Sequence, residues 1–175
     1  MPSPIGHSLA GLAAGWLTNR PSPAWKPLLL QAAVLCAIGM APDLDLLWGR
    51  HSRETHSIGA AVCVGFVAAW RRWPVGASTR LGIFFSVALA WTLHPVMDAF
   101  SIDNAEPVGV MLWWPVSSAF VHAAHPVFDP ISRHWNSPDI WSHNFNAAVH
   151  ELLKLGPVAL LIWLLRRRRA SSLIH

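Results

Sequence analysis

Apolar residues gather into five runs along the 175-residue chain, and each run is nearly free of charge. The runs cover about residues 5–18, 27–41, 56–70, 81–97 and 152–165. Runs of this length that are apolar on every side predict helices with no solvent-facing stripe, as in a bilayer. Ser3 and Pro4 precede the first run as an N-cap and a first-turn proline, so we expect a helix there rather than a removable signal peptide.

The five predicted helices are short for a membrane. Each core has about 14 to 17 residues, which gives roughly 21–26 Å of helix against a hydrocarbon thickness of roughly 30 Å. Snorkelling Arg and Lys side chains, Trp residues or local thinning of the bilayer can close this gap. We therefore expect the helices to cross the membrane, and the alternative is a bundle that is only partly sunk in it.

The region between the fourth and fifth runs has a different composition. Residues 101–151 contain five prolines and are rich in Trp, His and Asn. This pattern predicts an irregular cap with short helices and an extended piece at residues 110–114. The predicted fold is a single all-α domain, with a helical bundle at residues 5–100, a cap at 101–151, and a last helix and basic tail at 152–175.

The composition supports a membrane protein. The chain is 53% hydrophobic and 13% charged, with eleven Trp and no Tyr, and its mean hydropathy is +0.37. The net charge is +4, but the basic residues flank apolar runs instead of forming a patch, so we expect no nucleic-acid partner. Cys36 and Cys63 lie inside apolar runs, and we expect both to be free thiols.

The charges also predict an orientation. Basic residues occupy alternate connections, namely Arg20 with Lys26, then Arg71, Arg72 and Arg80, then Arg166 to Arg169. The positive-inside rule makes these segments cytoplasmic, the C-terminus included. The N-terminus, residues 42–55 and the cap then face outward from a multi-pass inner (cytoplasmic) membrane protein, and this side holds all nine acidic residues and nine of the ten histidines.

Six of these residues lie at the outward ends of the predicted helices and form a candidate metal site. They are His7, Asp43, Asp45, His56, His94 and Asp98. His94 and Asp98 are four residues apart, so they share one helical face. Imidazole with carboxylate suits Zn, or alternatively Mn or Fe, more than Mg or Ca. Each residue also has a structural explanation, because a single His or Asp at a helix end can cap the chain or meet the headgroup layer.

Further polar residues have less certain roles. Arg53 is placed to hold an anionic substrate oxygen or, alternatively, to meet a lipid headgroup or Glu54. We expect Trp113 and Trp114 to anchor the cap at the membrane interface. The remaining candidates either form a second subsite or are solvated surface groups, and they are His122, His125, Asp129, His143, His150 and Glu151.

Four motifs resemble a known family. They are Pro42-Asp43-Leu44-Asp45, Arg53-Glu54-Thr55-His56-Ser57, His94-Pro95-Val96-Met97-Asp98, and Gly109-Val110-Met111-Leu112-Trp113-Trp114-Pro115. In this order, with His7 ahead of them, they are similar to the YdjM-like membrane-bound metal-dependent hydrolases, a family also labelled LexA-binding, inner-membrane-associated hydrolases. The resemblance covers about residues 5–115 and implies a multi-helix membrane protein with metal-dependent hydrolase activity.

The order of ligands is also similar to that of zinc-dependent phospholipases C. On that likeness Asp43 or Asp45, His56, His94 and Asp98 form one metal site, and His7 with a bridging Asp98 forms part of another. The late His-x-x-x-Glu motif of those enzymes has no clean counterpart, since His143 and Glu151 are eight residues apart.

The predicted function is hydrolysis of a phosphoester, plausibly of a phospholipid, because the site faces the headgroup layer. Asp43 or Asp45, whichever is not a ligand, is the expected base. Arg53 is expected to neutralise phosphoryl charge, and His51 to protonate the leaving group. A metal transporter and a non-enzymatic scaffold or regulator are the alternatives, and the sequence leaves the oligomeric state open.

Overall fold

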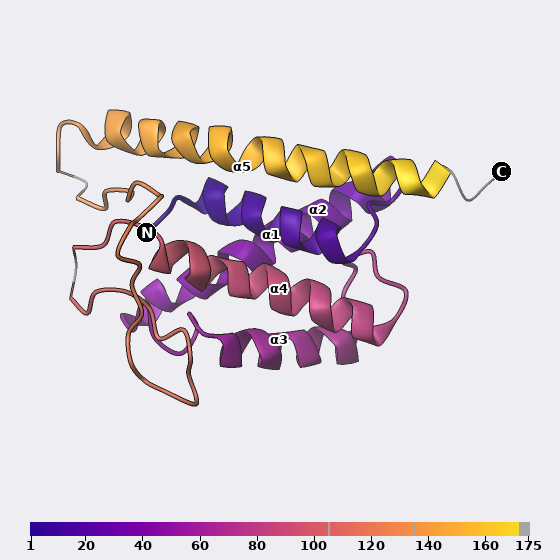
Figure 1. The fold of residues 1–175 in the computed structure, drawn as a ribbon, viewed down its shortest axis with the longest axis horizontal. Coiled ribbons are helices and arrows are strands. Elements are labelled where there is room, and N and C mark those ends of the chain that lie inside the picture. Colours follow the sequence, from indigo (N-terminus) through magenta and orange to yellow (C-terminus); the bar gives the residue numbers. More distant parts are fainter. Residues whose placement is uncertain (105, 135, 172–175) are drawn as a thin grey trace.

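Five α-helices run back and forth along one long axis of the computed structural model (Figure 1), which describes residues 1–104, 106–134 and 136–171. They are α1 Pro4–Thr18, α2 Trp25–Met40, α3 Ile58–Arg71, α4 Arg80–Ala99 and α5 Ile140–Ser171, with a 3₁₀ helix, η1, at Ala41–Trp48. The part of the chain that the structure describes has two isolated β-bridges and no named strand. The predicted all-α membrane-type bundle is confirmed.

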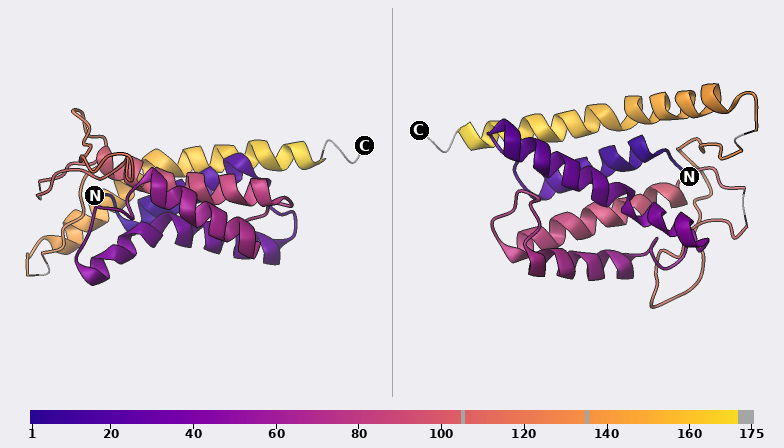
Figure 2. Two further views of the ribbon diagram at one scale, coloured as in Figure 1. Left: turned by 90° about the horizontal axis from the view of Figure 1, so that it is seen from below. Right: turned by 180° about the vertical axis from the view of Figure 1, so that it is seen from behind.

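Helix α1 lies inside the bundle, in contact with α2, α4 and α5. Small residues allow this position. A Cβ on Gly11 would meet the Leu35 carbonyl oxygen at 2.6 Å and the Gly39 Cα at 2.9 Å, so α1 and α2 approach backbone to backbone, as small residues permit in membranes. Helix α3 contacts α4 on the side of the bundle away from α5 (Figures 1 and 2).

The two ends of the bundle have opposite character. The cap end carries the start of α1, η1, the α2–α3 connection and the long segment between α4 and α5. The basic end carries the α1–α2 and α3–α4 connections and the last turns of α5 (Figure 1). All nine acidic residues lie in residues 43–54 and 98–151. The predicted sorting of ligands to one end is therefore present in the fold.

Among the described residues, three helical segments are long and apolar enough to cross a membrane: Trp25–Trp48, Arg80–Ala99 and Ile140–Arg167. The apolar helix Ile58–Arg71 is shorter than a span, and α1 has only 15 residues, or roughly 22 Å. Large apolar side chains on these spans are exposed, such as Leu29 on α2 and Leu161 on α5. Lipid is the medium that removes such side chains from water.

Helix α5 begins at Ile140, twelve residues before the predicted start at residue 152. Its first turns are polar and lie against the cap, where the Asn144 side chain accepts from the Ser132 amide at 2.7 Å and donates to the Ser132 carbonyl at 3.0 Å. Because the helices were predicted from runs of apolar residues, these polar turns were missed. The cap therefore spans residues 100–139, and its described residues contain no helix. Within the predicted extended piece, Val110 forms an isolated bridge with Val121, and turns follow.

The chain also stays helical after residue 41, where the second predicted helix ends. Pro42 lies in the first turn of η1, where its missing N–H removes no helical hydrogen bond. Gly49 ends the segment with a positive φ of 71°. As a result Asp43 and Asp45 stand on a helical turn that prolongs α2, instead of on a flexible loop.

A candidate metal centre at the cap end

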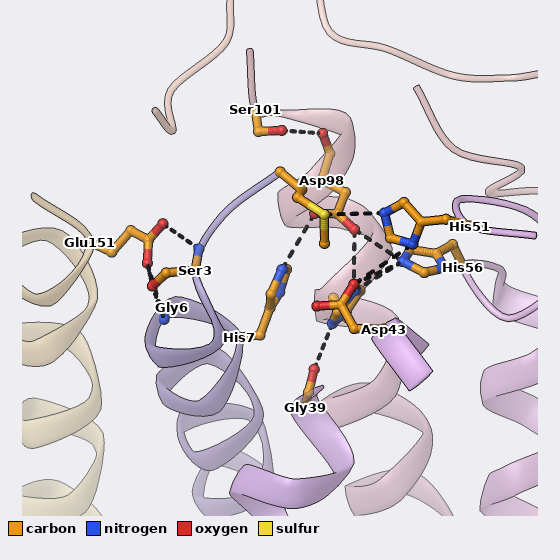
Figure 3. Close-up of polar contacts among 12 residues, drawn as sticks. Ser3, Gly6, His7, Gly39, Asp43, His51, His56, Asp98, Ser101 and Glu151 are labelled. Atoms are coloured by element: carbon orange, nitrogen blue, oxygen red, sulfur yellow. Dashed lines mark hydrogen bonds and ion pairs between the residues drawn. The ribbon is translucent and has the colours of Figure 1, made fainter. Parts of the chain in front are cut away.

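The predicted ligands come from four elements and meet at the cap end of the bundle (Figure 3). His7 stands in the first turn of α1, Asp43 in η1 and His56 just before α3. His94 and Asp98 occupy the last turns of α4. Asp43, His56, His94 and Asp98 each offer one ligand atom, and these four atoms lie within 4.8 Å of one another.

The spacing of these four atoms suits one small cation. His94 Nε2 lies 3.1 Å from His56 Nε2 and 3.2 Å from Asp98 Oδ2, and His56 Nε2 lies 3.3 Å from Asp98 Oδ2. Asp43 Oδ1 is 3.4 Å from His94 Nε2 and 3.7 Å from His56 Nε2. Four N and O ligands at about 2.0–2.2 Å from a tetrahedral ion are separated by roughly 3.3–3.6 Å. The cluster can therefore hold a metal ion.

Hydrogen bonds leave the inward imidazole nitrogens free to ligate. His94 Nδ1 donates to the Gly39 carbonyl oxygen at 2.7 Å, and His56 Nδ1 lies 3.0 Å from Asp45 Oδ2. Both rings therefore direct Nε2 at the cluster. A His whose second nitrogen is held by a carbonyl or a carboxylate is the usual arrangement around protein-bound metals.

This geometry separates Asp43 from Asp45. Asp45 is 1% exposed and bonds His51 Nδ1 at 2.8 Å, and it also accepts from the Thr55 hydroxyl. Its oxygens face the outer nitrogens of His51 and His56, whereas Asp43 faces the inner ones. Asp45, His51 and His56 form a second group of potential ligands, but the hydrogen bonds of Asp45 fit a residue that orients the ligands.

Buried polar atoms without partners mark the space where a cation fits. Both ring nitrogens of His7 and both carboxylate oxygens of Asp98 are buried and lack hydrogen bonds, as does Asp43 Oδ1. Such orphans are rare in folded proteins. His7 stacks on His94 with ring centroids 3.6 Å apart, and its Nε2 lies 3.4 Å from Asp98 Oδ1. Asp98 thus faces His56 and His94 with one oxygen and His7 with the other.

The charges at the site also favour a cation. Burial lowers the pKa of His56, but the nearby carboxylates of Asp43, Asp45 and Asp98 outweigh burial and raise that pKa well above its ordinary value. Three carboxylates in a buried site need positive charge. Asp43 and His51 are 18% and 21% exposed, whereas His56, His94 and Asp98 are at most 4% exposed. Access to the cluster is therefore past Asp43 and His51.

Glu151 was a candidate without a settled role, and the structure gives it one. Its carboxylate reaches from α5 to the start of α1, where it accepts from the Ser3 amide at 2.7 Å, the Gly6 amide at 3.1 Å and the Ser3 hydroxyl. The side chain is 1% exposed. It therefore fixes the helix turn that presents His7 (Figure 3). The one signal in the sequence is an acidic residue at the edge of an apolar run.

The other candidates lie outside the cluster. His122 bonds the Ser101 carbonyl at 3.0 Å, His143 the Pro130 carbonyl at 2.7 Å, and His150 the Asp129 carboxylate at 3.0 Å. These contacts fasten the cap and α5. His125 is exposed. Arg53 lies half-buried in the α2–α3 connection, where its carbonyl accepts from the His56 amide at 2.9 Å.

Comparison with known protein families identifies the family to which this chain belongs. The family model described as YdjM inner membrane protein matches residues 1–171. The chain belongs to the YdjM inner membrane protein family. No curated protein and no solved structure matches it. Membership of the YdjM family confirms the resemblance carried by the motifs, and it supports a location in a membrane.

The YdjM match also extends the resemblance. The motifs in the sequence end at Pro115, whereas the match continues to residue 171. The cap and α5 are therefore part of the family domain. This extent agrees with the position of Glu151, since the site needs α5 to hold the start of α1.

Proposed function

We propose that this YdjM-family protein is a membrane-bound, metal-dependent hydrolase that cleaves a phosphoester of a lipid. The observation that carries the proposal is the buried cluster of two imidazoles and two carboxylates with tetrahedral spacing. This donor set suits Zn best, with Mn and Fe as alternatives. A bound divalent cation would supply Lewis acidity toward a phosphoryl oxygen and would acidify a water.

The residues take the following roles in this proposal. Asp43, His56, His94 and Asp98 hold the cation, and His7 with the second oxygen of Asp98 begins a second site. Asp45 orients His51 and His56 through their Nδ1 atoms. His51 stands at the partly exposed mouth, where it can pass a proton to the leaving group. Arg53 neutralises phosphoryl charge from the same connection.

An apolar groove supports a lipid as the substrate. The groove has a volume of about 390 Å³ and lies between α2, α4 and the start of the α3–α4 connection. Ala41, at its cap end, precedes Pro42 and Asp43, and Trp91 stands one turn before His94. Pockets of roughly 300–1,000 Å³ hold small-molecule ligands. A phospholipid whose acyl chain enters from the bilayer along this groove would bring the phosphoester of its headgroup toward the cluster.

The proposal is tested on detergent-purified protein by metal analysis and by hydrolysis of a short-chain chromogenic phosphodiester and a long-chain phospholipid. We expect stoichiometric metal and activity in the wild type. We expect both to be lost in His94→Ala and Asp98→Asn but kept in His125→Ala, an exposed histidine of the cap. Wild-type protein without metal would overturn the proposal. Metal without hydrolysis, together with metal uptake into vesicles, would favour a transporter.

The orientation is part of the proposal. Basic connections at one end and the cluster at the other support, through the positive-inside rule, a site on the extracytoplasmic face and a C-terminus in the cytoplasm. Ser118 is an exposed cap residue. With Cys36 and Cys63 replaced by Ser, we expect Ser118→Cys to react with a membrane-impermeant maleimide in spheroplasts. Reaction only after the membrane is opened would reverse the orientation.

A further inference from the structure

A small polar pocket lies at the basic end of the bundle, opposite the metal-ligand cluster. It has a volume of about 290 Å³, and its walls come from the end of α1, the α3–α4 connection and α5. Asn19, Thr79 and Arg166 belong to these three walls. The proposed hydrolase site uses none of these residues.

Two buried donors in this pocket have no partner. Arg166 donates from Nη2 to the Thr18 carbonyl at 3.2 Å, but its Nε is buried without a hydrogen bond. Asn19 is 8% exposed, and its Nδ2 is also buried without one. A guanidinium nitrogen and an amide nitrogen only donate. The missing partner must therefore be an acceptor.

Helix α4 adds positive potential to the same pocket. Thr79 is its N-cap and accepts from the Gly82 amide at 3.0 Å. The amides of Arg80 and Leu81 precede the first intrahelical bonds. The helix is 20 residues long, and a helix N-terminus favours a bound anion.

No Asp or Glu side chain among the described residues lies at this end of the bundle. Every Asp and Glu lies within residues 43–54 and 98–151, and these segments belong to the cap end and the adjoining turns of α5. Arg166 is half-buried, and its buried Nε has neither a counter-charge nor a hydrogen-bond acceptor. An anion from outside the chain would supply both the acceptor that these two donors lack and a counter-charge for Arg166.

The pocket is held in shape before any ligand arrives. Gln31 of α2 is 1% exposed, and its Nε2 donates to the carbonyls of Arg20 at 3.2 Å and Val75 at 3.1 Å. Its Oε1 accepts from the Ser22 amide at 3.1 Å. Gly76 has a φ of 83°, and a Cβ there would collide with the Gln31 amide. One buried side chain thus fixes both connections that line the pocket.

The residues around the pocket indicate which anion is available to it. Three Trp residues at this end carry a cation over the ring, namely Trp25 with Lys26, Trp70 with Arg71 and Trp163 with Arg167. Trp and basic side chains concentrate at the headgroup level of membranes. We propose that this pocket binds a phosphate group, supplied either by a phospholipid headgroup or by free phosphate.

The test uses full-length protein in detergent with two probes: inorganic phosphate, followed by thermal shift, and phosphatidylglycerol, followed by native mass spectrometry. We expect Arg166→Gln to weaken binding about tenfold to a hundredfold, the effect of losing hydrogen bonds from a charged donor. Arg167→Gln, an exposed neighbour, is the matched control and should bind like the wild type. A response to phosphate identifies a free-anion site, and retention of one phosphatidylglycerol identifies a headgroup site.

A second variant keeps the test valid if Arg166→Gln does not fold. Asn19→Asp is nearly isosteric and places a carboxylate in the pocket. We expect it to raise the melting temperature without ligand and to abolish binding of both probes. The proposal is overturned if neither probe binds the wild type in an Arg166-dependent way, or if Asn19→Asp binds them as the wild type does.

Discussion

Replacement of Glu151 by Ala tests the link between α5 and the site. The change removes three hydrogen bonds to the start of α1, at the Ser3 amide, the Ser3 hydroxyl and the Gly6 amide. A hydrogen bond to a charged group contributes about 1.5–3 kcal/mol. Because the three bonds share one carboxylate, they are not additive, and we expect the free energy of unfolding to fall by about 3–5 kcal/mol.

Two controls separate the capping role from general damage. Glu151→Gln keeps the shape and one acceptor, so we expect a loss of about 1–2 kcal/mol. His150→Ala removes an exposed neighbour, so its effect should be about 0.5 kcal/mol or less. The assay is equilibrium unfolding in mixtures of SDS and a mild detergent, with metal content measured in parallel.

Glu151→Ala should also weaken metal binding, because Glu151 holds the turn of α1 that carries His7. His7 is next to Gly6, so a loosened first turn of α1 displaces the imidazole that faces Asp98. Loss of a supporting residue typically costs ten- to a hundredfold in metal affinity. If Glu151→Ala unfolds within about 1 kcal/mol of the wild type and keeps its metal, the capping argument is wrong.

Three further predictions, tested with five substitutions, concern the site and its scaffold. Asp43→Asn removes a proposed ligand and should abolish metal binding, whereas Asp45→Asn removes only an orienting group and should weaken affinity about ten- to a hundredfold in zinc titrations; equal losses would refute the distinction. Gly39→Ala forces a Cβ onto the His7 carbonyl and should cost about 1–3 kcal/mol of stability, whereas Gly156→Ala meets only an ordinary contact at 3.5 Å and should unfold like the wild type. Ala37→Trp fills the apolar groove and should reduce hydrolysis of long-chain phospholipid at least tenfold more than that of a short-chain phosphodiester; equal reduction would mean that the groove does not hold the acyl chain.

The helices were predictable where apolar character alone decides them. The first and fourth runs agree with α1 and α4 nearly to the residue, because Ser3 and Thr79 are standard N-caps. The start of α5 was missed because its first turns are polar and are held by Ser132 of the cap. That contact is a tertiary one, so the pattern of apolar residues along the chain does not reveal it.

The candidate ligands were predictable because successive helices return to the same end. The sequence could not show which of Asp43 and Asp45 is a proposed metal ligand and which orients the ligands, since both follow Pro42 within three residues. Which carboxylate faces the inner nitrogen depends on the turn of η1 and on the Thr55 hydroxyl. The role of Glu151 depends on a contact across 148 residues with Ser3, which local sequence does not encode.

The enclosed position of α1 has a consequence for biosynthesis. This helix is made before the other described helices, yet its neighbours include α5, which is made after them. Its 15 residues are fewer than the roughly 20 that hold a segment across a bilayer unaided. Helix α1 therefore lacks the Glu151 contact that fixes its start until α5 has been made. The cluster of metal ligands therefore reaches its final geometry only after α5 has been synthesised.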